Sequence, residues 1–121
     1  FFFGANQQVK QARDASNLVV ELSGDKPFNF GIISGGNSDF AYRYFFKLAG
    51  KDPVFIKSPH EDPERRTVTD QLLVVCEKPA AECHPLGEPS WQISGFGRAE
   101  IDGRWASSVL TIIKLRHYTG Q

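Results

Sequence analysis

The chain lacks three features that would each point to a broad class of protein. It has no apolar run of the roughly 18 residues that a membrane-spanning helix needs. It has no methionine, even at its first position, and no net charge, with 14 basic and 14 acidic residues. Balanced charge gives no reason to expect nucleic acid or an anionic membrane surface as the main partner. A start at Phe1 indicates a fragment or a processed product.

Residues 1–121 are expected to form one domain. A chain of 121 residues that is 40% hydrophobic, with ten phenylalanines, can bury a sizeable core. The aromatics Phe1, Phe2 and Phe3 precede Gly-Ala-Asn, a pattern typical of a membrane helix meeting its interface. Residues 1–5 are therefore interpreted as a juxtamembrane segment or the edge of an expressed piece, with packing onto the domain as the plainer alternative.

Cysteine is scarce, and its two occurrences lie close together. Cys76 and Cys83 have Pro79 and Pro85 around them, so in an oxidising compartment they would form a small disulfide loop at a turn. In cytosol they would be two ordinary thiols. A metal site using both cysteines with His84 would lack ligands, because no second Cys-x-x-Cys or histidine pair exists. The disulfide is the favoured interpretation.

Apolar residues recur at helical spacing between Asn6 and Leu22, and Gly24 follows where a helix commonly ends. The spacing predicts a first helix that covers one face of a sheet. A strand from Phe28 to Ser34 comes next, as a run of apolar residues bounded by turn signals. The stripe of the helix consists of Val9, Ala12, Ala15, Val19 and Leu22.

A second helix is predicted to begin near Asp39 and to end at Gly50, with Pro53 preventing its continuation. The short apolar run 54–56 then predicts a strand parallel to the first one, by the crossover rule for βαβ units. The apolar face of this helix is expected to hold Phe40, Ala41, Tyr44, Phe45 and Leu48, with Tyr42 and Phe46 widening the arc.

Exposed loops flank a buried strand in the middle of the chain. The segment Lys57–Thr67 is charged, contains two prolines and has no hydrophobic period, which predicts an exposed loop. Glu61 and Asp62 lie within it, and their carboxyl pKa values are expected to stay ordinary. The run Leu72–Val75 suits a central strand, and Glu77–Pro89 is predicted to be a second loop, which carries Cys83.

The last third of the chain predicts two antiparallel strands. The first runs through Trp91–Ile101, with a bulge or tight bend at Gly95 and Gly97. Asp102-Gly103 is a hairpin signal, and Trp105–Leu115 returns as the second strand. The predicted fold is a single α/β domain: a mixed β-sheet with a βαβ start, two main helices and a C-terminal antiparallel hairpin.

The best candidate for a binding site is the turn between the first strand and the second helix. Successive backbone amides at a helix start can hold an anion or a sugar hydroxyl. No lysine follows the glycines, the G-x-G-x-x-G pattern is missing, and Asp39 would repel a phosphate. A neutral polar ligand is expected, unless the turn only caps the helix. The candidate ligand-binding residues are Ser34, Gly35, Gly36, Asn37, Ser38, Asp39 and Arg43.

No local pattern indicates a catalytic centre. His60, His84 and His117 lie in predicted loops or near the end of the chain, and no serine lies in a G-x-S-x-G elbow. Arg65 and Arg66 could grip a phosphate or carboxylate, although such a pair more often solvates a loop. No catalytic residue, metal ligand or cofactor is assigned.

Three stretches carry a resemblance to a known family: FNFGIISGGNSDFAYRYFFKLAG, TDQLLVVCE, and CHPLG with WQISGFGRAEI. They resemble the soluble C-terminal domain of bacterial membrane glycosyltransferases similar to dolichyl-phosphate-mannose-protein mannosyltransferases. The resemblance runs from Val9 to Leu115. It implies an extracytoplasmic, non-catalytic accessory domain, because the catalytic acidic residues of that class lie in the membrane portion. The implied partners are the membrane portion of the same polypeptide and a sugar or polyprenyl-linked ligand, with no nucleic acid.

Two other functions fit the residues. One is a free-standing small α/β enzyme or ligand-binding module that uses the turn from Ser34 to Asp39 with Arg43 or Arg65. The other is a structural domain whose exposed aromatic side chains dock on a protein partner.

Overall fold

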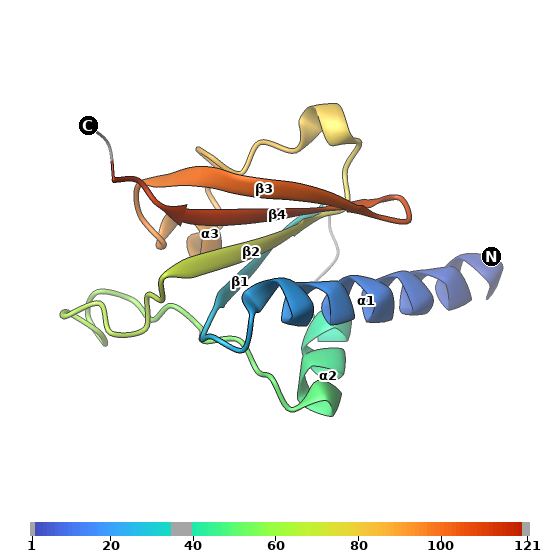
Figure 1. The fold of residues 1–121 in the computed structure, drawn as a ribbon, viewed down its shortest axis with the longest axis horizontal. Coiled ribbons are helices and arrows are strands. Elements are labelled where there is room, and N and C mark those ends of the chain that lie inside the picture. Colours follow the sequence, from blue (N-terminus) through green and yellow to red (C-terminus); the bar gives the residue numbers. More distant parts are fainter. Residues whose placement is uncertain (1, 35–39, 120–121) are drawn as a thin grey trace.

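A four-stranded mixed sheet forms the centre of the computed structural model, which describes residues 2–34 and 40–119, with the backbone alone for residues 2–8 (Figure 1). The strand order is β1-β2-β4-β3, in which β1 is parallel to β2 and the other neighbours are antiparallel. The predicted α/β domain with a βαβ start, two main helices and a C-terminal hairpin is confirmed. The elements are α1 (Phe2–Ser23), β1 (Asn29–Ile33), α2 (Phe40–Ala49), β2 (Gln71–Cys76), the 3₁₀ turn η1 (Ala80–Glu82), α3 (Trp91–Ser94), β3 (Ala99–Ser107) and β4 (Leu110–His117).

The first helix, α1, covers the sheet with its C-terminal half. Ala12, Ala15 and Val19 of the predicted stripe are buried, whereas Val9 is 55% exposed. Gly24 follows the helix with φ at +64°, in the left-handed conformation that strains any residue with a Cβ atom. The predicted helix and its end are therefore confirmed.

The second strand of the βαβ unit is β2, and the predicted strand at 54–56 is absent from the structure. A single parallel bridge joins Asn29 to Val54. The backbone of Ile56 is bonded to a side chain instead: Gln92 Oε1 accepts its N–H at 2.9 Å, and Gln92 Nε2 donates to its carbonyl at 3.1 Å. Because these groups are already bonded, this segment does not extend the sheet beyond β1.

Both faces of the sheet are covered, which explains why all six residues of β2 are buried. α1 and α2 cover one face, termed the helix face, and α3 with two loops covers the other, termed the loop face (Figure 1). Strand residues of the helix face are Phe30, Leu73, Val75, Leu110 and Ile112; those of the loop face are Ile33, Leu72, Val74, Ile113 and Leu115.

A disulfide joins Cys76, the last residue of β2, to Cys83, with their Cα atoms 6.0 Å apart. Both cysteines are buried on the loop face, in the same cluster as Ile93 and Phe96. The favoured interpretation of the cysteine pair is confirmed. The bond ties the loop that follows β2, including η1, to the sheet.

The buried face of α2 differs from the predicted one. Tyr42 and Phe46 are buried, whereas Phe40, Tyr44 and Leu48 are 78%, 59% and 66% exposed. Phe46 packs edge-on against Phe30 of β1, with ring centroids 4.8 Å apart. Because this helix is apolar nearly all round, its hydrophobic period does not identify the buried side. The shape of the sheet surface decides which side of the helix is buried.

The predicted strand from Trp91 is also wrong, because the chain forms the short helix α3 there. Gly95 follows that helix in an ordinary right-handed conformation, and Gly97 turns the chain toward β3 with φ at +95°. Ile93 of α3 packs on Gly31 of β1, where an added Cβ atom would lie 2.6 Å from Ile93 Cγ1. Because Gly31 has no side chain, α3 can pack closely against β1 on this face.

The hairpin turns later than predicted. Ser107 pairs with Leu110, so the turn is Ser108-Val109, with Ser108 at φ +59°. Asp102-Gly103 forms a bulge inside β3, where the register shifts between Ile101 and Gly103. The Cβ atom of any other residue at Gly103 would lie 2.4 Å from the ring of Trp105, so this glycine makes room for an aromatic side chain.

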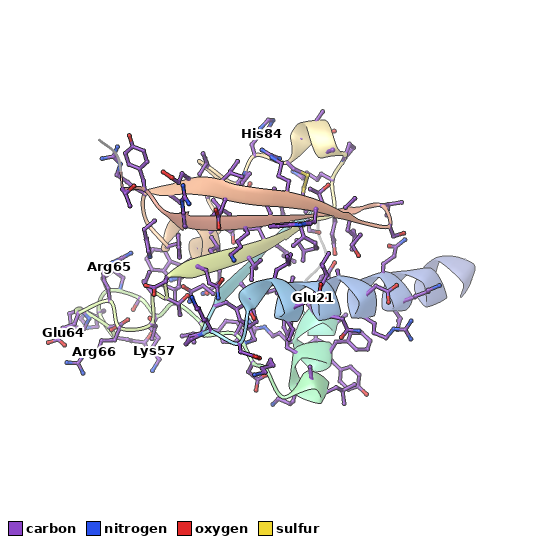
Figure 2. The ribbon with its side chains drawn as sticks, viewed as in Figure 1. Glu21, Lys57, Glu64, Arg65, Arg66 and His84 are labelled. Atoms are coloured by element: carbon purple, nitrogen blue, oxygen red, sulfur yellow. A yellow bond between two sulfur atoms is a disulfide. The ribbon has the colours of Figure 1, made fainter. Side chains whose placement is uncertain are left out.

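The loop 57–67 is exposed as predicted, and Figure 2 shows Lys57, Glu64, Arg65 and Arg66 on it, away from α1 and α2. Asp62 is an exception, since only 9% of it is exposed. Its carboxylate accepts hydrogen bonds from the Thr67 hydroxyl, from the Thr67 N–H at 2.7 Å and from the Arg66 N–H at 2.9 Å. These bonds lower the pKa of Asp62, so the expectation of an ordinary value is corrected.

Candidate anion-binding site

The predicted binding turn is described only at its edges. Gly35, Gly36, Asn37, Ser38 and Asp39 lie outside the described residues, and Ser34 is a half-buried residue directly after β1. The guanidinium of Arg43 stacks on the ring of Phe55 at 3.8 Å from its centroid. Ligand binding at this turn therefore stays a prediction.

At the carboxyl ends of the two parallel strands, Glu77 forms a hydrogen-bonded pair with Tyr42 of α2. Glu77 follows β2 and donates its backbone N–H to the carbonyl of Ile33 at 2.8 Å. The hydroxyl of Tyr42, on α2, donates to Glu77 Oε2. Burial, and then the hydrogen bond and charge of Glu77, raise the pKa of Tyr42. A carboxylate and a protonated phenol make this edge unsuitable for a bound anion.

The opposite end of the sheet, where β2 begins, is rich in basic side chains. A cavity of about 740 Å³ opens where β2 begins and β4 ends. Four basic side chains line it from three separate parts of the chain, and Asp70 is the acidic residue in its lining. The basic residues are Lys26, Arg66, Lys114 and Arg116.

Lys114 is held in the cavity by its position on β4. It lies opposite Leu73 of β2, on the helix face. Its ammonium Nζ donates to the carbonyl of Leu22 at 3.1 Å. That carbonyl belongs to the last turn of α1, where the helix dipole is negative and stabilises a cation. One N–H is used there, which leaves two donors for a ligand.

Lys26 is held in place by a buried glutamine. Gln71, the first residue of β2, donates its Nε2 to the carbonyls of Ser23 at 2.9 Å, Pro27 at 3.2 Å and Lys26 at 3.4 Å. These bonds fix the backbone of the connection between α1 and β1, which carries Lys26 at the rim. Within the described part of the chain, the Lys26 ammonium has no hydrogen bond or ion pair.

A second polar network supports the inner side of the cavity. Asn29 is fully buried, and its Nδ2 donates to the carbonyls of Val54 at 2.8 Å and Thr67 at 2.9 Å. Its Oδ1 accepts from the N–H and hydroxyl of Thr69 at 2.7 and 2.9 Å. The Thr69 carbonyl lies 2.8 Å from Nε2 of His117. Since these groups satisfy one another, the network is a rigid support and not itself a ligand site.

The two arginines of the cavity are already paired with carboxylates. Arg66 forms an ion pair with Glu64, and both side chains are largely exposed. Arg116 binds Glu100 at 2.8 Å and Asp102 at 3.3 Å, and its hydrogen bond with Glu100, then the charges of both, raise its pKa. Among the described residues, the two lysines are therefore the cations of the cavity that no carboxylate neutralises. Ammonium groups bind phosphate and carboxylate as point charges, so the site suits a small anion.

The structure separates the two arginines that the sequence offered as phosphate or carboxylate ligands. Arg65 donates Nη2 to the carbonyls of Gly95 at 2.8 Å and Phe96 at 3.4 Å, so it ties the loop 57–67 to the chain after α3. Arg66, its neighbour, does line the cavity. Lys26 and Lys114 were not among the predicted site residues, because isolated lysines far apart in the chain carry no motif.

Other kinds of site have no support in the described ranges. Residues 2–34 and 40–119 contain no cluster of three or more histidine, cysteine, aspartate or glutamate side chains arranged to hold a metal ion. No helix within them has the length and apolar character needed to cross a membrane. Comparison of the chain with protein-family models, curated proteins and solved structures found no match. The cavity is thus characterised by its own geometry alone.

Proposed function

We propose that the chain is a non-catalytic, extracytoplasmic accessory domain of a membrane glycosyltransferase, which binds the phosphate of a polyprenyl-phosphate sugar. The observation that carries the proposal is the cavity in which Lys26 and Lys114 present ammonium groups with unused donors. A sugar carrier of this kind offers a phosphate as its one strongly charged group. Two lysines can bind it without a motif of the P-loop type.

The disulfide supports the location. Disulfides persist mainly in oxidising compartments, outside the cytoplasm. Cys76 and Cys83 are joined and buried, and they anchor a loop of the loop face. The resemblance of the sequence to the C-terminal domain of such glycosyltransferases points in the same direction. Free-thiol counting on protein purified without reductant tests this part, and two reactive thiols would contradict it.

Titration of isotope-labelled protein, followed by amide chemical shifts, tests the binding site. The ligands are inorganic phosphate, a short water-soluble prenyl phosphate, and the free sugar mannose. We expect both phosphates to shift the amides around Lys26, Gln71 and Lys114, and the effect to weaken as salt is raised.

A matched pair of variants identifies the cations. Lys26→Gln with Lys114→Gln removes both, and we expect phosphate affinity to fall about 10-fold to 100-fold, as for the loss of charge-assisted hydrogen bonds. The control, Lys10→Gln with Lys57→Gln, removes two exposed lysines outside the cavity and should bind as the unmodified chain does. Equal losses in the two variants would reject the site.

A second candidate function is binding of a neutral polar ligand at the turn from Ser34 to Asp39. Its supporting observation is the position of Ser34 and Glu77 after the two parallel strands, since ligands of α/β sheets commonly bind at the carboxyl ends of strands. The same titration distinguishes the two sites. Mannose that shifts the amides of Gly35 to Asp39, with no response around Lys26, would favour this alternative.

A further inference from the structure

A tryptophan of α3 is held rigidly while part of its ring stays exposed. Trp91 is the first residue of that helix and is 41% exposed. Its indole Nε1 donates to the carbonyl of Ile56 at 2.9 Å. The ring also lies against the backbone of Gly95, where an added Cβ atom would be 2.9 Å from Cε2 and 3.0 Å from Cζ2 of the indole. The ring is therefore fixed in place, and its single N–H is already bonded.

The indole lines a cavity of about 440 Å³, termed the Trp91 cavity. The rest of the lining comes from Ile56 and from the first part of the loop 57–67. No residue of this lining belongs to the lining of the cavity that holds Lys26 and Lys114, so the two are separate sites. The lining residues are Ile56, Lys57, Ser58, Pro59, Glu61 and Trp91.

The loop that lines the Trp91 cavity is braced by its own hydrogen bonds. The carbonyl of Ser58 accepts the N–H of Asp62 at 2.8 Å. The carboxylate of Asp62 accepts the N–H of Thr67 at 2.7 Å, and Thr67 Oγ1 accepts the N–H of Lys57 at 3.0 Å. Because the ring and the loop are both held already, a ligand would not have to order them.

The side chains of the Trp91 cavity restrict the chemistry of a ligand. Lys57 and Glu61 carry opposite charges, so the lining has no net charge and does not favour an ion. An entirely apolar ligand would remove Ser58 and Glu61 from water without new hydrogen bonds. The indole offers only an apolar surface, because its N–H is bonded to Ile56. A matching ligand is neutral, with C–H groups on one face and hydroxyl groups at its edge.

We propose that the Trp91 cavity binds a saccharide. A pyranose ring carries C–H groups on its faces and hydroxyl groups around its edge, which is the combination required. Its C–H face would lie on Trp91, and its hydroxyls would bond to the Glu61 carboxylate and the Ser58 hydroxyl. Ser58 Oγ lies 3.5 Å from Glu61 Oε1, so hydroxyls on adjacent sugar carbons can reach both. This inference rests on the cavity and does not depend on the glycosyltransferase proposal.

Titration of the isotope-labelled 121-residue chain with cellotetraose tests the inference. The equatorial substituents of its glucose units leave both faces of each ring lined with C–H groups. We expect saturable shifts of the Trp91 Nε1–H signal and of the amides of residues 57–61, with the Nε1–H of Trp105 unchanged as an internal reference. Raising salt should have little effect, because the ligand is neutral. Sorbitol, which has hydroxyls but no ring, should produce no such shifts.

Two tryptophan variants separate the role of the ring from that of its hydrogen bond. Trp91→Ala removes the aromatic surface, and we expect affinity for cellotetraose to fall about 10-fold. Trp91→Phe keeps an aromatic ring but loses the N–H, and affinity should change by less than about threefold. The matched control is Tyr118→Ala, which removes a ring that is 46% exposed outside the Trp91 cavity and should bind normally. Circular dichroism melting checks that each variant is folded.

A further variant leaves Trp91 and the fold of α3 untouched. Ser58→Ala with Glu61→Gln removes the polar partners on the exposed loop, and we expect affinity for cellotetraose to fall about 5-fold. The control on the same loop is Glu64→Gln, because Glu64 pairs with Arg66 and does not line the Trp91 cavity. Equal affinities of these two variants would contradict the proposed hydrogen bonds.

Four outcomes would overturn the inference: no shift of the Trp91 Nε1–H with cellotetraose up to its solubility limit, equal shifts with sorbitol, unchanged affinity in Trp91→Ala, or tighter binding of adenosine, which would indicate a nucleobase site. The variant Lys26→Gln with Lys114→Gln separates the two proposals and should bind cellotetraose normally. If the unmodified chain binds phosphate but not cellotetraose, the Trp91 cavity alone is rejected, and the reverse would reject the proposed function alone.

Discussion

The two faces of the sheet are covered in different ways. The helix face carries α1 and α2, and its core is built from aromatic rings, with Phe30 between Tyr42 and Phe46. The loop face carries the four-residue helix α3 and two long loops. Its covering chain is secured by a disulfide and by bonds from side chains to the backbone.

The difference shows what irregular chain requires in order to cover a sheet. A helix satisfies its own backbone groups, so packing of side chains is enough to hold it. A loop has no such internal ladder, and its backbone groups need partners from elsewhere. Ile56 receives them from Trp91 and Gln92, and Gly95 receives one from Arg65. Inside the loop 57–67, the side chain of Asp62 bonds the backbone N–H groups of Arg66 and Thr67.

The largest effect should come from truncating an aromatic side chain of the helix face. Phe30→Ala is expected to lower the free energy of unfolding by about 4–5 kcal/mol, because Phe30 is fully buried against Tyr42 and Phe46 of α2, and a packed helix collapses little around a cavity. Phe96→Ala, on the loop face, should cost nearer 3 kcal/mol, since loops can relax. Urea denaturation measures both. A larger loss of stability for Phe96→Ala than for Phe30→Ala would contradict the expected difference between the two faces.

Removal of the disulfide should affect the loop face selectively. With the seven-residue separation of Cys76 and Cys83, loss of the bond is expected to cost about 2–3 kcal/mol. Cys76→Ala with Cys83→Ala, followed by hydrogen exchange, should show faster exchange in the loop after β2 and in α3, with α1 still protected. Uniform acceleration over both faces would contradict this.

The contact between α3 and β1 can be tested at a glycine. Gly31→Ala should destabilise the fold by about 1–3 kcal/mol, because the new Cβ atom would lie 2.6 Å from Ile93 Cγ1. Introducing the same change into an Ile93→Ala background removes the clash, so its cost should fall there. An equal cost in both backgrounds would mean that α3 does not depend on this close approach.

The smallest effect concerns the hydrogen bonds of Asp62 and depends on pH. The folded protein holds the pKa of Asp62 below its ordinary 3.8, so its carboxylate contributes stability above that value and loses it as pH falls through the folded-state pKa. Asp62→Asn should therefore be less stable than the unmodified chain at neutral pH. Chemical denaturation at several acid pH values should show the difference in free energy of unfolding between the two proteins shrinking as pH falls. A difference that does not change with pH would exclude the ionised carboxylate as its cause.

Several features followed from local sequence signals. The continuous apolar run Leu72–Val75 predicted a central strand, and β2 is buried along its whole length. Gly24 and Gly50 mark helix ends, and both adopt positive φ. The spacing of Cys76 and Cys83 fitted a disulfide loop. Such signals hold because φ/ψ preferences and strand burial depend on a few adjacent residues.

Other features depended on residues far apart. The sequence Asp102-Gly103 is a strong hairpin signal, yet Gly103 is used to accommodate Trp105, and the turn forms at Ser108-Val109. Pairing with β4 selects this register, because it places Trp105 opposite Ile112 on the helix face. Burial of a large aromatic side chain therefore outweighs the local preference of Asp-Gly for a turn.

The sequence by itself determined the class of the fold, the C-terminal ends of both main helices and the central strand, and it favoured a disulfide between the two cysteines. Only the tertiary structure decided which side of α2 is buried, where the hairpin turns, and that Lys26 and Lys114 share one cavity. The physical reason is that local signals act through neighbouring dihedral angles and hydrophobic period. The choice between two apolar sides of a helix, and the meeting of distant cations, depends on surfaces that exist only after the sheet has formed.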